Sequence, residues 1–314
     1  MLSSARLGFG LAAVGRPAYI TTDRADDLGD PTERSIATLR ARAHLLLDEA
    51  WALGIRYVDA ARSYGLAEEF LGGWLAAHPE RREQLAIGSK WGYAYVGEWK
   101  MDATVHERKE HSAAMFDRQW PETLAALGSA PDIYLIHSVT PESTALSDEK
   151  VLRRMRRLAA EGVRVGLSTS GPRQADVVRA AMRLDDSPFT VVQSTWNILE
   201  PSVGAALGEA RDAGWTVVLK EVLANGELAS AKSGSDVAVA ASGVAADIYA
   251  FGAALAQPFA DLVLSGATTV AHLRRGAGAR AAELDSDLLD SDLLERLAME
   301  PGEYWSRRSA RPWR

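Results

Sequence analysis

Short apolar runs alternate with longer segments of helical periodicity along most of the chain. Each run is rich in β-branched or aromatic residues and is bounded by polar residues or glycine, which is the pattern of a buried strand. The runs expected to form strands are Leu7–Leu11, Ile55–Asp59, Leu85–Lys90, Ile133–His137, Val163–Ser168, Thr190–Ser194, Thr216–Lys220 and Leu262–Gly266.

Between these runs, apolar positions recur at the spacing of one helical face. The stretch 36–53 has this spacing and is followed by Gly54, a residue suited to a helix C-terminal cap. The stretches 151–159 and 203–210 are likewise followed by Gly162 and Gly214. Helix, glycine and strand in repeated order predict parallel βα units, and eight of them predict a closed (β/α)8 barrel. An open doubly wound sheet is the structural alternative.

No linker divides the sequence, so residues 1–314 are expected to form a single barrel domain. Two polar stretches, 16–33 and 93–120, are long for βα loops, and long loops in compact domains tend to be functional. Residues from about 283 to 314 are expected to form a C-terminal tail. Its end, "EYWSRRSARPWR", is interpreted as a solvated segment that packs two tryptophans rather than as a ligand-binding segment.

Composition and charge exclude several classes of function. The net charge of −7 argues against nucleic acid as a partner, because phosphate binding needs clustered Lys and Arg. No apolar run is long enough to span a bilayer, so no membrane partner is expected. Cysteine is absent, which excludes disulfides, thiolate catalysis and Cys-ligated zinc and fits a cytoplasmic location.

Three consecutive expected strands end on ionisable residues. These residues are Asp59, Lys90 and His137, and Tyr64 follows Asp59 after a short turn. Because barrel enzymes assemble their sites at the carboxyl ends of the strands, the four side chains are expected to converge. A single residue of this kind would most often belong to a structural ion pair, but three with an adjacent phenol favour a functional site.

Together these four residues form an acid–base device. A lysine ammonium stabilises a phenolate and lowers the pKa of the phenol, and a paired carboxylate keeps the lysine charged and oriented. A histidine can donate a hydrogen bond to a substrate oxygen or carry a proton. The set suits interconversion of a carbonyl and an alcohol, with a cofactor to supply the hydride.

The motifs around these residues resemble those of the aldo-keto reductases, in order and in spacing, from Leu7 to about Ala282. The similar segments are "VDAARSYGLAEEFLGGWL", "SKWG", "PDIYLIHS", "VGLSTS", "VVQSTWN", "LANGEL" and "LSGATTVAHL". The resemblance implies a (β/α)8 barrel that binds a nicotinamide cofactor and a small carbonyl or alcohol substrate. It implies that Tyr64 is the general acid/base, that Asp59 and Lys90 tune it, and that His137 orients the substrate.

The resemblance also implies a set of cofactor contacts, in which Ser168 and Gln193 hold the nicotinamide carboxamide. The full set is Ser168, Thr169, Gln193, Lys220, Leu223, Gly226, Gly266, Thr268, His272 and Arg275. Many members of the family have an aromatic residue on the seventh strand that stacks on the nicotinamide, where this chain has Lys220, and Trp196 is a candidate to replace it. Arg274 and Arg275 favour NADP, with NAD as the alternative, because guanidinium suits a 2′-phosphate.

The substrate pocket is expected to be built from the segment 93–120, the loop 16–33 and the C-terminal tail. The predicted substrate-binding residues are Trp91, Tyr93, Trp99 and Trp196. Aromatic faces beside polar donors favour a sugar-like or other polar substrate.

Other motifs fit their patterns poorly. "GFGLAAVG" places its third glycine too late for a Rossmann fingerprint, and "GLSTSG" lacks the second glycine of a nucleophile elbow. "HERKEH" places His106 and His111 five residues apart, which is not one helical face, so a charged loop over the barrel mouth is favoured over a metal site. Two other functions stay open: a cofactor-binding regulatory subunit with little turnover, and a metal-dependent barrel hydrolase.

Overall fold

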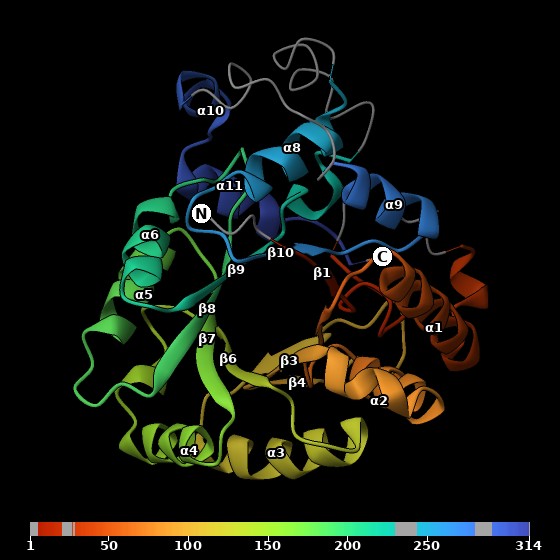
Figure 1. Ribbon diagram of the computed structural model, residues 1–314, viewed down its shortest axis with the longest axis horizontal. Coiled ribbons are helices and arrows are strands. Elements are labelled where there is room, and N and C mark those ends of the chain that lie inside the picture. Colours follow the sequence, from red (N-terminus) through yellow and green to blue (C-terminus); the bar gives the residue numbers. More distant parts are fainter. Residues whose placement is uncertain (1–5, 21–26, 28, 230–243, 280–290, 314) are drawn as a thin grey trace.

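The strands of the molecule form a closed barrel surrounded by helices (Figure 1). The computed structural model describes residues 6–20, 27, 29–229, 244–279 and 291–313. Among these residues, eight parallel strands close in the order β1-β10-β9-β8-β7-β6-β3-β2. They are Arg6–Gly10 (β1), Tyr57–Asp59 (β2), Ala86–Trp91 (β3), Ile133–Val139 (β6), Arg164–Thr169 (β7), Phe189–Thr195 (β8), Thr216–Lys220 (β9) and Leu262–Ser265 (β10). The fold is therefore the predicted (β/α)8 barrel and not an open sheet.

All eight predicted strands are confirmed, and helices separate most of them. The helices in the described residues are Ile36–Ala52 (α1), Ala67–Ala77 (α2), Ala113–Leu127 (α3), Glu149–Ala160 (α4), Gln174–Met182 (α5), Gly204–Asp212 (α6), Ala246–Leu255 (α8), Val270–Gly278 (α9), Ser291–Leu297 (α10) and Pro301–Ser309 (α11). Gly54 and Gly162 follow α1 and α4 with φ of 77° and 93°. Because an L side chain is strained at these angles, glycine is suited to end both helices.

Side chains alternate between the inside of the barrel and the surrounding helices. An inner cluster, which we call the barrel floor, consists of Tyr57, Ile133, Leu135, Val191, Val218 and Leu264. The ring of Tyr57 fits there because β1 and β3 carry glycine beside it. A Cβ atom on Gly8 would lie 2.8 Å from the ring, and one on Gly88 would lie 2.2 Å from the hydroxyl.

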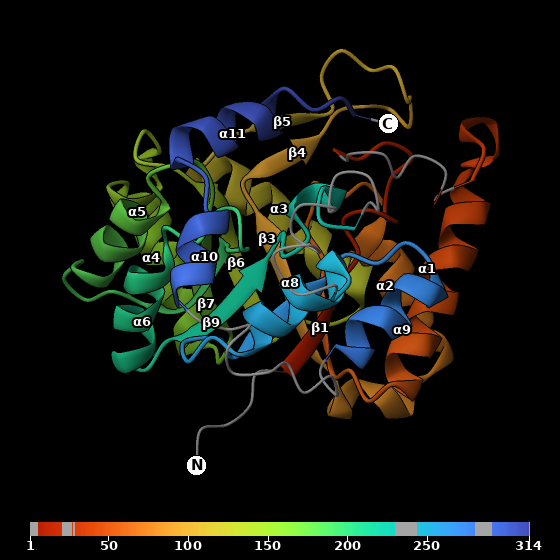
Figure 2. The same ribbon diagram turned by 90° about the horizontal axis from the view of Figure 1, so that it is seen from above.

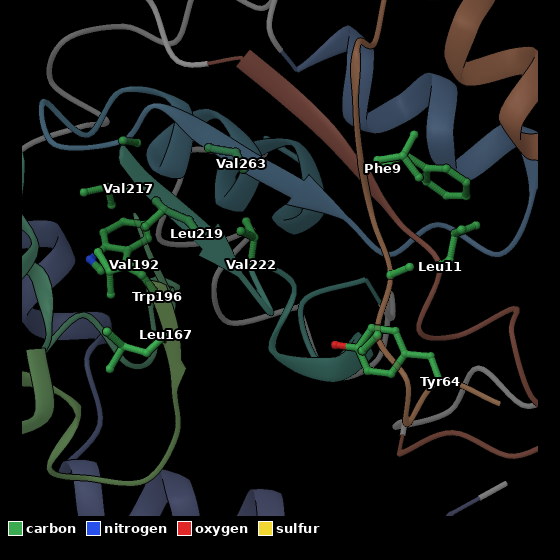
Figure 3. Close-up of a cluster of buried hydrophobic side chains, with 14 of the residues drawn as sticks. Phe9, Leu11, Tyr64, Leu167, Val192, Trp196, Val217, Leu219, Val222 and Val263 are labelled. Atoms are coloured by element: carbon green, nitrogen blue, oxygen red, sulfur yellow. The ribbon is translucent and has the colours of Figure 1, made fainter. Parts of the chain in front are cut away.

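The larger apolar core packs the outer faces of the strands against the helices. Figure 3 shows part of it, with Val217, Leu219 and Val263 on one side and Phe9 and Leu11 on the other. Burial of such side chains is the main favourable contribution to the stability of the barrel. The outer core thereby fixes the strands whose ends carry the ionisable residues.

Two segments outside the barrel, a hairpin and a C-terminal helix, lie at the same end of it. The predicted loop 93–120 forms a hairpin, Tyr93–Tyr95 (β4) with Glu107–Lys109 (β5), and then enters α3. Figure 2 shows the hairpin and α11 at the same end of the barrel. From the loop 16–33, residues 21–26 and 28 lie outside the described residues, as do residues 283–290 of the predicted tail. Ile20 and Trp313 meet in an isolated antiparallel bridge.

None of the helices that the structure describes combines the length and the apolar character needed to cross a bilayer.

Candidate active site

The strand positions two residues beyond the barrel floor point into the mouth of the barrel. Asp59, Lys90, His137, Gln193 and Lys220 each lie two residues after an inward-facing position of the same strand, so they face the same side. They lie at the carboxyl-terminal part of β2, β3, β6, β8 and β9. The structure therefore brings together the three strand-end residues that the sequence predicted to converge.

Lys90 and Asp59 form a buried ion pair at the centre of this group. Lys90 is 0% exposed, and its Nζ donates to Asp59 Oδ2 at 2.5 Å and to the carbonyl oxygen of Ala60 at 2.9 Å. Burial lowers the pKa of Lys90, and the charge of Asp59 opposes that change. The pair keeps an ammonium inside the barrel, where a lone charge would be costly.

Gln193 connects this ion pair to the other side of the barrel. Its Nε2 donates to Asp59 Oδ1 at 2.7 Å. Its Oε1 is buried and has no hydrogen-bond partner among the described residues. A buried acceptor without a partner costs free energy, so Gln193 Oε1 is suited to an amide or hydroxyl donor of a bound molecule.

Tyr64 lies above the ion pair, on the turn between β2 and α2. Lys90 Nζ donates to the Tyr64 hydroxyl at 3.3 Å, and the side chain is 9% exposed. Burial raises the pKa of Tyr64 well above its ordinary value, and Asp59 raises it further. The lowering expected from Lys90 is thus outweighed, and Tyr64 is a protonated phenol at neutral pH.

His137 lies beside Tyr64 as a neutral imidazole. The two rings meet edge to face with centroids 5.5 Å apart, and Tyr93 contacts His137 at 5.0 Å. Burial lowers the pKa of His137 well below its ordinary value, and the charges of Lys90 and Lys220 lower it further. His137 Nδ1 lies 3.3 Å from Ser63 Oγ, and a neutral ring keeps one N–H to donate.

A cavity of about 470 Å³ extends from Tyr64 and His137 to the start of α9. Most of the residues predicted to bind a cofactor line it. These are Gln193, Lys220, Leu223, Gly226, Gly266, Thr268, His272 and Arg275. The cavity therefore joins the acid–base group to the turn before α9 in one continuous space.

Ser168 and Thr169 are not among the residues that line the cavity. Ser168 Oγ accepts a hydrogen bond from the backbone N–H of Ser138 at 2.7 Å. Thr169 Oγ1 donates to Gln174 Oε1 at 3.0 Å and lies 2.7 Å from Ser194 Oγ. Both hydroxyls are thus engaged inside the protein.

The two arginines predicted to favour NADP have different surroundings. Arg275 lines the cavity but donates two hydrogen bonds to Asp247, at 2.7 and 2.6 Å. Arg274 is paired with Glu49 on the surface and does not line the cavity. His272 Nδ1 lies 3.7 Å from Asp27 Oδ2. Any 2′-phosphate at this end would share Arg275 with a carboxylate.

Of the four aromatic residues predicted to bind substrate, Tyr93 alone lines the cavity among the described residues. Trp91 is fully buried against Phe116. Trp99 Nε1 donates to the carbonyl oxygen of Arg34 at 3.0 Å, and Trp196 packs on Phe259. The ring of Trp196 is therefore not placed to cover the cavity.

Three residues that the sequence did not single out surround Tyr64. Arg16 is 2% exposed, and its Nη1 donates to Glu107 Oε1 at 2.7 Å. The Cζ atom of Arg16 lies 5.4 Å from the centroid of the Tyr64 ring and 4.7 Å from that of Trp313. The C-terminal tail, whose end is predicted to be solvated but which is also expected to help build the substrate pocket, thus contributes Trp313 and Arg308 to the cavity wall.

A second charged group lies at the end of β9. Arg308 holds the carboxylate of Glu221 with two hydrogen bonds, and Lys220 Nζ donates to Thr195 Oγ1 at 2.8 Å. Burial alone would raise the pKa of Glu221, but Arg308 and Lys220 bring it down to about 2. Burial lowers the pKa of Lys220 to about 8. Lys220 thus brings a cation to the cavity, at the position where many members of the family have an aromatic ring.

The two histidines of "HERKEH" make separate contacts inside the protein. His106 stacks on Trp313 with centroids 4.6 Å apart, and His111 Nε2 lies 2.7 Å from the carbonyl oxygen of His137. In the described part of the chain, no group of three or more His, Asp or Glu side chains is placed to hold a metal ion.

The closed barrel carries a buried phenol, lysine and carboxylate together at its mouth, which is the end where barrel enzymes assemble their sites. A model of the aldo/keto reductase family matches residues 7–241, well over half of the chain. The chain therefore belongs to the aldo/keto reductase family.

Individual relatives are more distant. Aldo-keto reductase str7 of Strobilurus tenacellus is 28% identical over 190 residues, which cover 58% of this chain and 51% of that protein. The match thus spans about half the length of that relative. The holo form of aldo-keto reductase AKR11C1 from Bacillus halodurans has a TM-score of 0.67 at 20% identity, over 95% of this chain and 93% of that chain. PA4992 from Pseudomonas aeruginosa, described as an aldo-keto reductase, has a TM-score of 0.62 at 23% identity, over 89% and 92%. At these identities the structural likenesses bear on the fold.

Proposed function

We propose that the chain is an NAD(P)-dependent oxidoreductase that interconverts an aldehyde or ketone with an alcohol, with Tyr64 as the general acid/base. The observation that supports it most is the network in which Lys90 Nζ contacts both Asp59 Oδ2 and the Tyr64 hydroxyl, at 2.5 and 3.3 Å. This network lies at one end of a cavity whose lining reaches from Tyr64 to Gly266, Thr268 and Arg275.

Tyr64 moves the proton in this reaction. In carbonyl reduction, the protonated phenol donates its proton to the carbonyl oxygen as the carbonyl carbon accepts a hydride. A nicotinamide held beside Gln193 would supply or accept that hydride. Lys90 stabilises the phenolate that remains, and Asp59 keeps Lys90 charged. In alcohol oxidation the same phenolate takes the proton back.

His137 positions the substrate in this mechanism. Because its imidazole is neutral, one ring N–H is available to a carbonyl oxygen held near the Tyr64 hydroxyl. Two donors that meet at one oxygen fix its position and stabilise the charge that develops on it.

The cavity walls fit the two ends of a nicotinamide dinucleotide. Gln193 Oε1 lacks a partner among the described residues and would accept from a carboxamide N–H beside Tyr64. At the other end, α9 begins after Thr269, next to Gly266 and Thr268. The N–H groups at a helix N-terminus and its dipole suit phosphate groups.

The wall around Tyr64 supports a polar substrate. Arg16, Glu107 and Arg308 carry charges, and Tyr93 and Trp313 present aromatic faces beside them. Such a mixture favours a sugar-like or other oxygen-rich molecule over an apolar one.

Incubation of the protein with NADPH and a panel of aldehydes, ketones and sugars is expected to oxidise NADPH, fastest with polar carbonyl compounds. Loss of NADPH absorbance measures the rate, and alcohols with NADP⁺ test the reverse direction. Chelators should have no effect. Tight binding of NADPH without turnover of any compound would instead support a cofactor-binding regulatory subunit.

We propose NADP as the preferred cofactor, on account of Arg275 and His272 at the far end of the cavity. Asp247 competes for Arg275, so Asp247→Asn is expected to strengthen NADPH binding about fivefold, the size of one partly exposed charge pair. NADH binding should change little. Fluorescence titration of both cofactors measures the effect.

Glu49→Gln is the matched control, because Glu49 holds Arg274 in the same way outside the cavity. It should leave both dissociation constants unchanged. Equal effects of Asp247→Asn on NADPH and NADH would show that Arg275 does not contact the 2′-phosphate.

A further inference from the structure

A buried arginine lies directly against the turn that carries Tyr64. Arg16 Nη1 donates to the carbonyl oxygen of Ser63 at 2.8 Å and to Glu107 Oε1 at 2.7 Å. Its guanidinium lies between the rings of Tyr64 and Trp313, with Cζ at 5.4 and 4.7 Å from their centroids. Four separate parts of the chain thus meet around one charge.

Glycine brings the two loops close enough for this contact. A Cβ atom on Gly15 would lie 2.2 Å from the carbonyl oxygen of Tyr64, and Leu66 N–H donates to the carbonyl oxygen of Gly15 at 2.7 Å. Gly65 has φ of 62° and its own Cβ would lie 2.4 Å from the Gly15 oxygen. The backbone therefore fixes Arg16 beside Tyr64 and leaves neither loop free to withdraw.

A contribution to folding stability does not explain the ion pair between Arg16 and Glu107. Arg16 and Glu107 are 2% and 19% exposed in their side chains, and Arg16 Nε is buried with no partner among the described residues. A largely buried ion pair with an unsatisfied donor gives little or no net stability compared with apolar side chains of similar size. Its position against Tyr64 points to a functional role.

We propose that Arg16 and Glu107 are positioning residues that set, with opposite signs, how readily Tyr64 releases its proton. The proposal rests on the proposed role of Tyr64 in proton transfer. Arg16 is a cation against the phenol ring and favours the phenolate. Glu107, which accepts a hydrogen bond from Arg16, is an anion and favours the phenol.

Apart from Arg16 and Glu107, the charged groups that face Tyr64 belong to ion pairs. The titratable and charged groups that face it are Asp59 of β2, Lys90 of β3, His137 of β6, Glu107 of β5, Arg16 and Tyr19 of the loop after β1, and Glu221 after β9. Asp59 is paired with Lys90, Glu221 with Arg308, and His137 is neutral. Burial and Asp59 raise the pKa of Tyr64 most, Glu107 raises it further, and Arg16 lowers it.

The pH dependence of the reduction rate tests the two roles, because substitutions of Arg16 and of Glu107 should displace it in opposite directions. Reduction needs protonated Tyr64, so its rate falls as pH rises through the pKa of Tyr64. Arg16→Met removes the cation and is expected to move this alkaline limb upward by about one pH unit, whereas Glu107→Gln should move it downward by a similar amount. The double variant should return close to the parent, and Arg16→Lys should restore the parent profile.

A merely structural role predicts a different result. Both single variants would then lower the rate at every pH, and the alkaline limb of the pH–rate profile would stay at the same pH in both. This outcome overturns the proposal. Arg154→Met and Asp117→Asn break an exposed ion pair between α4 and α3 that does not line the cavity, and they should leave the profile unchanged. Circular dichroism checks that each variant is folded.

A second readout needs no turnover. Tyrosinate absorbance is measured against pH in Glu107→Gln and in the double variant Glu107→Gln with Tyr64→Phe. The difference between the two curves follows the ionisation of Tyr64 alone. This ionisation should occur at lower pH than in the parent measured in the same way. An unchanged or higher midpoint refutes the role of Glu107 even if no carbonyl substrate is found, whereas absence of carbonyl turnover alone refutes the proposed function.

Discussion

Tyr64→Phe is expected to lower kcat at least about a thousandfold in both directions, within the range of general acid–base catalysis. The change removes one oxygen atom, the one to which Lys90 Nζ donates at 3.3 Å, and leaves the ring in place. The dissociation constant for NADPH should stay within about twofold, because the proposed cofactor contacts are on other residues. Steady-state kinetics and fluorescence titration together measure this separation.

Tyr249→Phe is the matched control for that experiment. Tyr249 is a buried tyrosine of α8 whose hydroxyl has no partner among the described residues, and it does not line the cavity. Its loss should leave kcat unchanged. A Tyr64→Phe enzyme with kcat near that of the parent would remove Tyr64 from the mechanism.

Lys90→Met is expected to abolish turnover and also to destabilise the fold by about 3–5 kcal/mol, because it leaves Asp59 as an uncompensated buried charge. Lys90→Met with Asp59→Asn should recover most of the stability, because the neutral amide introduced at position 59 can still accept a hydrogen bond from Gln193 Nε2. It should not recover activity, because the cation that stabilises the Tyr64 phenolate is still missing.

Urea unfolding and kcat are the two measurements for this pair of variants. Stability and activity that return together in the double variant would show that Lys90 acts through the fold alone. A stable Lys90→Met variant would show instead that Asp59 finds another partner or binds a proton.

The barrel and the convergence of Asp59, Lys90 and Tyr64 at its mouth could be predicted because both depend on local patterns. A period-2 apolar run predicts a strand, and its last inward position predicts a residue at the mouth. Asp59 and Lys90 follow this rule, each two residues after an inward-facing position. The same rule, applied strictly, places Trp91 on the outer face, where the structure has it packed on Phe116.

The rest of the site depends on contacts between distant segments. Arg16 reaches Tyr64 because Gly15 and the turn at Gly65 pack backbone against backbone, and no periodicity in either segment indicates this. Trp313 reaches Arg16 from the far end of the sequence. The hydroxyl of Ser168 bonds the N–H of Ser138, which lies on a neighbouring strand. Only the assembled barrel reveals these partners.

The ion pair between Glu221 and Arg308 restricts which substitutions this chain can accept during evolution. Glu221 has φ of 56°, an angle that costs a side-chain-bearing residue about 1 kcal/mol or more, and Asn197 holds its carbonyl oxygen at 3.0 Å. Asn197 also donates to Tyr304 of α11 at 2.9 Å. A substitution at any one of these positions leaves a buried charge or a strained turn unsupported. Positions 197, 221, 304 and 308 are therefore expected to covary among relatives, although they are spread over more than a hundred residues of sequence.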